Sequence, residues 1–143
     1  VTTVADVAGS LNNKYFLIAK AADAVKYYVW YSNGTGVDPA VAGRTGIKVT
    51  YSNGATAATI ASLTKTALDA ISGAWNTSIN GGGTQLTITN QAVGASTDAV
   101  DGTAATGFTI AVLTQGAAAN PTPTADASVA VRLEASSVKA SYV

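Results

Sequence analysis

The chain has 143 residues, enough for one domain with a single core, and its eight lysines plus arginines balance its eight aspartates plus glutamates. Without a net charge to attract phosphates or anionic lipids, nucleic acid and membrane surfaces are poor partners, and no apolar run reaches the ~20 residues of a membrane-spanning helix. Cysteine, histidine and methionine are absent, which excludes disulfides, thiolate or imidazole metal sites and the commonest general base.

Charged residues make up 11% of the chain, against about a quarter in ordinary soluble domains, so much of its surface must be uncharged. A free monomer with so little charge would tend to aggregate, whereas a subunit that buries its faces against copies of itself would not. The composition therefore favours a homo-oligomer. Position 1 is valine, which indicates either a processed start or a sequence that begins after a removed segment.

The chain begins with segments that favour β-structure. Residues 1–11 are predicted to be an N-terminal arm with a short strand, because apolar and small residues alternate along it. The residues on one face of this strand would be Val1, Thr3, Ala5 and Val7. Aromatic and β-branched residues crowd segments 14–18 and 24–31, which we expect to form a β-hairpin around a turn at 21–23.

A third strand at 47–51 and one helix are expected next. Ile47, Val49 and Tyr51 alternate with polar residues after a loop rich in turn-forming residues. In residues 56–72 the spacing becomes helical, with Thr56 as N-cap and Gly73 just beyond the C-terminus. The apolar stripe of this helix consists of Ile60, Leu63, Ala67, Leu68 and Ile71. It should cover one face of a sheet and leave the pair Lys65 and Asp69 in solvent.

The rest of the central region is again predicted to be β-structure. Segments 75–79 and 85–89 flank the turn sequence at 80–83 and should form a second hairpin. A turn-rich loop at 94–107 then leads to the apolar segment 108–114, which we expect to be a buried strand. The predicted fold class is therefore α+β and mainly β: an antiparallel sheet or sandwich with one packed helix and strand-like N- and C-terminal arms.

The last quarter of the chain has a different composition. Residues 117–124 are rich in alanine, threonine and proline and are predicted to be an extended linker, followed by a C-terminal strand arm at 125–143. The apolar residues that would act in this assembly arm are Val129, Val131, Leu133, Val138 and Tyr142. This strand could complete the sheet of a neighbouring subunit or fold back on its own domain, and the pattern alone leaves both open.

Few residues offer chemistry. Asp98 and Asp101 could supply oxygen ligands to a weakly bound calcium ion, but the loop lacks the alternation of an EF-hand, and turn capping is the expected role. Arg44 is expected to pair with an aspartate in a purely structural way. The glycine-rich segment 80–83 lacks the lysine and helix of a phosphate-binding loop. No catalytic residue, cofactor site or metal site is therefore predicted.

The order of several short motifs is similar to that in a known group of proteins. The motifs are Lys14-Tyr15-Phe16, Lys26-Tyr27-Tyr28-Val29-Trp30-Tyr31, Gly36-Val37-Asp38-Pro39, Gly43-Arg44-Thr45-Gly46-Ile47, the helix, residues 98–102 and Gly107-Phe108. Over residues 12–116 the chain thereby resembles a recurrent structural module of bacteriophage virion proteins. The resemblance implies a role in a tail, neck or head decoration that is architectural rather than enzymatic.

Three functions remain as hypotheses, in decreasing order of preference. The first is a non-enzymatic, self-assembling subunit of a bacteriophage virion, on the tail or head surface, or of a related helical assembly. The second is an extracellular bacterial or archaeal pilus-like filament or adhesin, in which the sequons at Asn33 and Asn76 or the linker threonines carry sugars. The third is an enzyme or small-ligand-binding domain. The first two imply an extracellular location and copies of the chain itself as partners.

Overall fold

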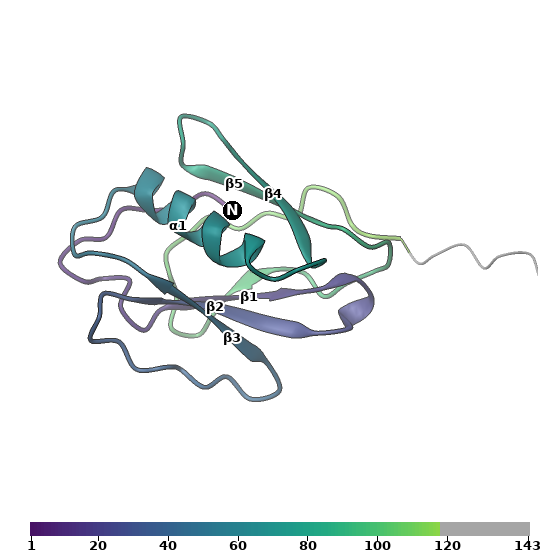
Figure 1. Ribbon diagram of the computed structural model, residues 1–143, viewed down its shortest axis with the longest axis horizontal. Helices are drawn as coiled ribbons and strands as arrows, with labels where there is room; N and C mark the ends of the chain where they lie inside the picture. The colour runs from purple at the N-terminus through teal and green to yellow at the C-terminus, as the bar shows by residue number, and fades with distance from the viewer. Residues whose placement is uncertain (118–143) are drawn as a thin grey trace, which may run out of the picture.

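The computed structural model describes residues 1–117 (Figure 1). The prediction of an α+β fold that is mainly β is confirmed, because one α-helix and six strands in two sheets make up this region. The elements are β1 Tyr15–Ala19, the 3-10 turn η1 Ala21–Asp23, β2 Lys26–Ser32, β3 Thr45–Thr50, α1 Ala57–Asp69, β4 Trp75–Asn80, β5 Gln85–Asn90 and β6 Val100–Asp101. Most of the predicted linker and the whole C-terminal arm at 125–143 lie outside the described residues.

The larger sheet has the strand order β3-β2-β1-β6. β1 and β2 form the predicted antiparallel hairpin, with η1 as its turn. β3 pairs with β2 in parallel, which is the exception among the strand pairs of the described region, since the other three are antiparallel as predicted. A parallel neighbour requires a connection of about a dozen residues or more, and the loop 33–44 is long enough to run back to the start of β2.

Side chains from β2 and from the segment just before β1 hold this long connection in place. The Tyr28 hydroxyl donates to Asp38 at 2.5 Å, and the side chain of Asn13 accepts from the backbone N–H of Val37 at 2.8 Å. The Tyr28 ring also lies across Gly46 at the start of β3, where a Cβ atom would meet its hydroxyl oxygen at 2.7 Å. Glycine at this position therefore lets β3 lie beside β2 under the tyrosine.

The smaller sheet is the second predicted hairpin, in which β4 pairs antiparallel with β5. Its free edge on β5 is occupied by the N-terminal residues: the backbone of Val1 exchanges hydrogen bonds with Leu86, and Thr2 bridges to Gln85 and Thr109. The expected N-terminal strand is thus reduced to an isolated bridge at Thr2. Val7 is 73% exposed rather than on an inner face, because the chain turns at Ala8 and Gly9, which both have positive φ.

Helix α1 packs against β3, β4 and β5 (Figure 1). Thr56 is its N-cap and accepts from the backbone N–H of Thr59 at 3.2 Å, as predicted. The helix ends at Asp69, three residues before the predicted end, and Gly73 takes the expected left-handed conformation beyond it. The predicted ion pair between Lys65 and Asp69 is present on the outer face.

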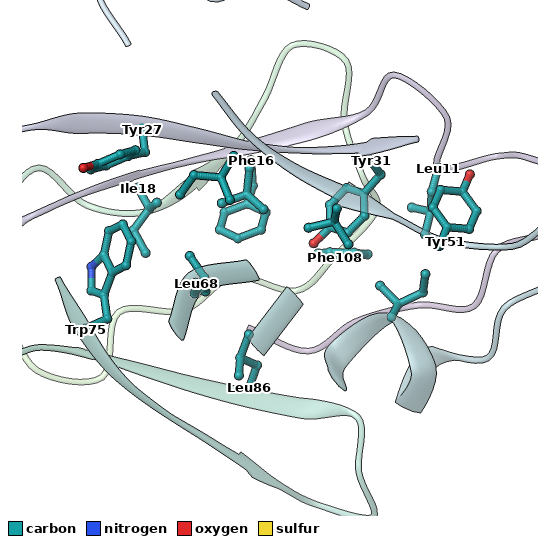
Figure 2. Close-up of a cluster of buried hydrophobic side chains, with 14 of the residues drawn as sticks. Leu11, Phe16, Ile18, Tyr27, Tyr31, Tyr51, Leu68, Trp75, Leu86 and Phe108 are labelled. Carbon is teal, nitrogen blue, oxygen red and sulfur yellow. The ribbon is translucent and has the colours of Figure 1, made fainter. Parts of the chain in front are cut away.

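The core lies between the two sheets and α1 and is rich in aromatic residues (Figure 2). Phe108 packs between Phe16 and Tyr31, with ring centroids 6.3 and 5.4 Å away, and Trp75 meets Tyr27 at 5.3 Å. Leu68 from α1 is fully buried in the same cluster. Aromatic residues from both sheets thus meet in this core, and a second, smaller buried cluster consists of Tyr15, Tyr28 and Trp30.

Segment 108–114 is not the buried strand that its apolar residues predicted. Phe108 enters the core and Thr109 forms an isolated bridge with Thr2, but residues 110–114 form no strand pairs with the described residues. The edge of β5 is already taken by the N-terminal residues, so the segment can pair only at this one point and then leaves the sheet. Val112 and Leu113 are consequently 46% and 82% exposed. A short strand, β6, forms instead within the predicted loop 94–107.

Candidate functional site

Of the two aspartates that could bind calcium, Asp101 has a defined structural role among the described residues and Asp98 does not. The Asp101 carboxylate accepts hydrogen bonds from the backbone N–H groups of Gly102, Thr106 and Gly107 and from the Thr106 hydroxyl, at 2.8 to 3.2 Å. Asp98 is exposed, and within residues 1–117 no three acidic side chains come together as metal ligands. Asp101 therefore fixes the turn that carries Phe108 into the core, and its oxygens are already engaged.

We expect calcium to leave the melting temperature unchanged. A ligand that binds only the folded state raises its stability by RT ln(1 + c/Kd) at free ligand concentration c, and Asp101 has little capacity left to bind a cation tightly. Thermal melts of the full chain in millimolar calcium and in chelator provide the measurement. A calcium-dependent rise that disappears in Asp98→Asn but not in Asp69→Asn would contradict this expectation.

Asp6 is a buried carboxylate that the sequence did not reveal. It is 4% exposed and accepts from the backbone N–H groups of Gly9, Leu11 and Gly54 and from the Tyr51 hydroxyl, at 3.0 to 3.2 Å. Desolvation alone would raise the pKa of Asp6, but these hydrogen bonds outweigh it and lower the pKa below its usual value. Burial and then the Asp6 charge raise the pKa of Tyr51 to about 12, so its hydroxyl remains a donor.

Asp23 links the β1–β2 hairpin to the loop before β6. It accepts from the hydroxyl and the backbone N–H of Thr97, at 2.5 and 2.7 Å, and these bonds, with a smaller contribution from Lys26, lower the pKa of Asp23 to about 2. Arg44 lies at the same end and donates to the carbonyl of Tyr27 at 3.1 Å. The expected ion pair between Arg44 and an aspartate is not found among residues 1–117, where the Tyr27 carbonyl accepts from the guanidinium instead.

The hollows of the described region are shallow and open. One is lined by Asp23, Lys26 and Arg44, and its charged groups are held by the bonds just described. The other is mainly apolar and is lined by Ala22, Val93 and the residues up to Thr97. The Thr97 hydroxyl and the Asp23 carboxylate both line the second hollow and are hydrogen-bonded to each other, and neither of these two hollows brings two carboxylates together.

Large apolar side chains are exposed at both ends of the β1–β2 hairpin. At the end where β1 begins, Val7 and Val37 are 73% and 74% exposed. At the other end, beside η1, Val93 and Leu113 are 79% and 82% exposed. The Gln115 side chain donates to the Ser96 carbonyl, so the segment that contains Leu113 lies against the loop that contains Val93. Val37 bonds to Asn13 just before β1, whereas the loop 93–97 bonds to Asp23 of η1, so the two exposed groups lie at opposite ends of the β1–β2 hairpin (Figure 1).

The five residues of the predicted assembly arm, Val129, Val131, Leu133, Val138 and Tyr142, lie outside the described residues. Among residues 1–117, no helix is long and apolar enough to cross a bilayer. Comparison with known proteins gives no match to a family model, a curated protein or a solved structure.

Proposed function

We propose that this chain is a non-enzymatic structural subunit that assembles with copies of itself on the outside of a bacteriophage particle, as part of the tail or head surface. The observation that carries the proposal is the exposure of large apolar residues at both ends of a body with few charges. A side chain such as Leu113 gains about 1.5 to 3 kcal/mol when it is fully buried, and contact between copies can supply that burial.

The polar groups of the described region favour the same class of function. Asp6, Asp38 and Asp101 accept hydrogen bonds from their own loops and fix turns, and Asp23 ties the β1–β2 turn to the loop at Thr97. Side chains used in this way stabilise the subunit and leave its ends to make contacts. The strand arm predicted at 125–143 would provide a further connection between subunits.

The first test is the association state of the full chain. We expect sedimentation velocity to show species that grow with concentration, and negative-stain microscopy to show regular assemblies. Val93→Ser combined with Leu113→Ser should weaken association, whereas Val4→Ser, at a residue that is only 38% exposed, serves as a matched surface control. A parent chain that stays monomeric at every concentration contradicts the proposal.

Microscopy of the native source material separates a virion from a free filament. Antibody against the chain should label phage tails or heads if the first hypothesis is right. Label on uniform free fibres, together with sugar at Asn33 or Asn76, would instead identify the pilus-like alternative.

A further inference from the structure

We propose that the free edge of β3 is the surface that accepts residues 128–135 from a second copy of the chain. This inference rests on the proposed self-assembly and names the two surfaces that meet. β3 is the outermost strand of the four-stranded sheet on one side, and β2 is its only strand neighbour within residues 1–117.

The outward backbone groups of β3 can be assigned from its hydrogen bonds. In a parallel pair, alternate residues of one strand direct both N–H and C=O toward the neighbour. Tyr51 donates its N–H to the Ser32 carbonyl, so the odd-numbered residues of β3 face β2. The N–H and C=O groups of Gly46, Lys48 and Thr50 therefore point away from the sheet, and no described residue satisfies them.

One face of β3 is apolar and the other is polar, which is the arrangement that an added amphipathic strand would continue. Ile47 and Val49 point into the core, whereas Gly46, Lys48 and Thr50 are exposed on the other face. Residues 128–135 have the same alternation, with Val129, Val131, Leu133 and Ala135 on one face and polar or small residues on the other. A strand added with its valines on the core side would continue both faces of the sheet.

Helix α1 offers an apolar surface beside this edge. Asp69 bonds to Thr77 of β4, so that flank of the helix is turned to β4. The opposite flank carries Leu63 and Ala67, which belong to the core but remain partly exposed, and α1 also contacts β3. A strand lying beside β3 would cover these two side chains with Val131 and Leu133.

Charge selects one register for the added strand. Lys48 is the only charged residue of β3 and lies over the Trp30 ring, 5.2 Å from its centroid. On the polar face of the arm, Glu134 opposite Lys48 pairs unlike charges, whereas Arg132 there would oppose like charges. The register with Glu134 opposite Lys48 is therefore the one we infer.

Proline substitutions in the full chain test the edge. Thr50→Pro removes an outward N–H while leaving the β2–β3 hydrogen bonds intact, since Thr50 faces away from β2. We expect it to weaken self-association about tenfold or more, with circular dichroism unchanged. The matched control is Thr77→Pro, because the antiparallel ladder directs Thr77 toward the unpaired edge of β4. Thr77→Pro should assemble like the parent.

The outcomes separate the two proposals. If the parent assembles and Thr50→Pro assembles equally well, the β3 edge is the wrong surface although self-assembly stands. If Thr77→Pro is the variant that fails, the arm binds β4 and the inference is overturned. If the parent never assembles, the proposed function itself fails.

Cysteine pairs distinguish exchange between copies from folding back. The natural chain has no cysteine, so Lys48→Cys in one chain and Glu134→Cys in a tagged second chain each introduce a single thiol. Mild oxidation of the mixture should give the mixed disulfide dimer, whereas Thr77→Cys mixed with Glu134→Cys should not. No mixed dimer, together with an internal disulfide in the doubly substituted monomer, would show that the arm occupies its own β3 and would overturn the proposal.

Discussion

Replacing Asp6 by alanine is expected to lower the free energy of unfolding by about 3 kcal/mol. The substitution removes the acceptor for three backbone N–H groups and the Tyr51 hydroxyl, and it leaves several of these donors buried without a partner. It also disconnects the N-terminal segment from the turn at Gly54. Urea denaturation of the full chain measures the effect.

Two control variants test whether the loss of stability in Asp6→Ala comes from its buried hydrogen bonds. Asp6→Asn keeps the shape but directs an amide N–H₂ at donors, so it should recover only part of the loss. Asp69→Ala removes an exposed carboxylate paired with Lys65 and should cost less than about 1 kcal/mol. A loss for Asp6→Ala no larger than that for Asp69→Ala would show that the buried hydrogen bonds contribute little.

The same carboxylate should make the fold sensitive to acid. Its pKa is lower in the folded chain than the value of about 3.9 in an unfolded one, so folding favours the ionised form. This stabilisation is fully present above the unfolded pKa and is lost as the pH falls through the folded pKa. Stability measured from pH 6 downward should therefore fall below about pH 4, and less steeply in Asp6→Asn.

Replacing Leu68 by aspartate is expected to prevent soluble folding. Leu68 is completely buried between the sheets, near Phe16 and Leu86 (Figure 2), and an unpaired charge there costs several kcal/mol out of a typical total stability of about 5 to 15 kcal/mol. Leu63→Asp and Ile71→Asp should have smaller effects, because these residues are only partly buried. Soluble yield and far-UV circular dichroism measure the outcome.

The matched control for Leu68→Asp is Lys65→Ala on the same helix. The Lys65 side chain is 35% exposed and pairs with an exposed aspartate, so its loss should change stability by less than about 0.5 kcal/mol. If Leu68→Asp yields a soluble protein with the parent spectrum, the position of α1 against the core is wrong.

Local patterns predicted the elements whose determinants are close in sequence. The concentration of aromatic and β-branched residues in β1 and β2, the cap at Thr56 and the glycine-rich turn between β4 and β5 each specify a structure within a few residues. The parallel pairing of β3 was not predicted, because strand spacing permits either direction. It depends on contacts between distant residues, such as Tyr28 with Asp38 across the long loop.

The same reason explains the errors near the termini. The pattern of residues 1–7 favoured Val7 as an inner residue, yet Asp6 is buried because its partners include Tyr51 and Gly54, far along the chain. The one local signal was an aspartate shortly before a glycine, which is typical of a turn. Segment 108–114 was predicted as a strand from its composition alone, whereas the strand edge available to it is occupied by residues 1–3.

The bridge at Thr2 also constrains the order of events during synthesis. Thr2 pairs with Gln85 and Thr109, so one of the earliest-made residues of the described region has partners that are made much later. At 5 to 20 residues per second the ribosome takes roughly 4 to 17 s to pass from Thr2 to Gln85 and roughly 5 to 21 s to pass from Thr2 to Thr109. The β1–β2 hairpin can form during that interval, before the partners of Thr2 exist. We therefore expect residues 1–3 to join the fold after this hairpin, once residue 109 has been made.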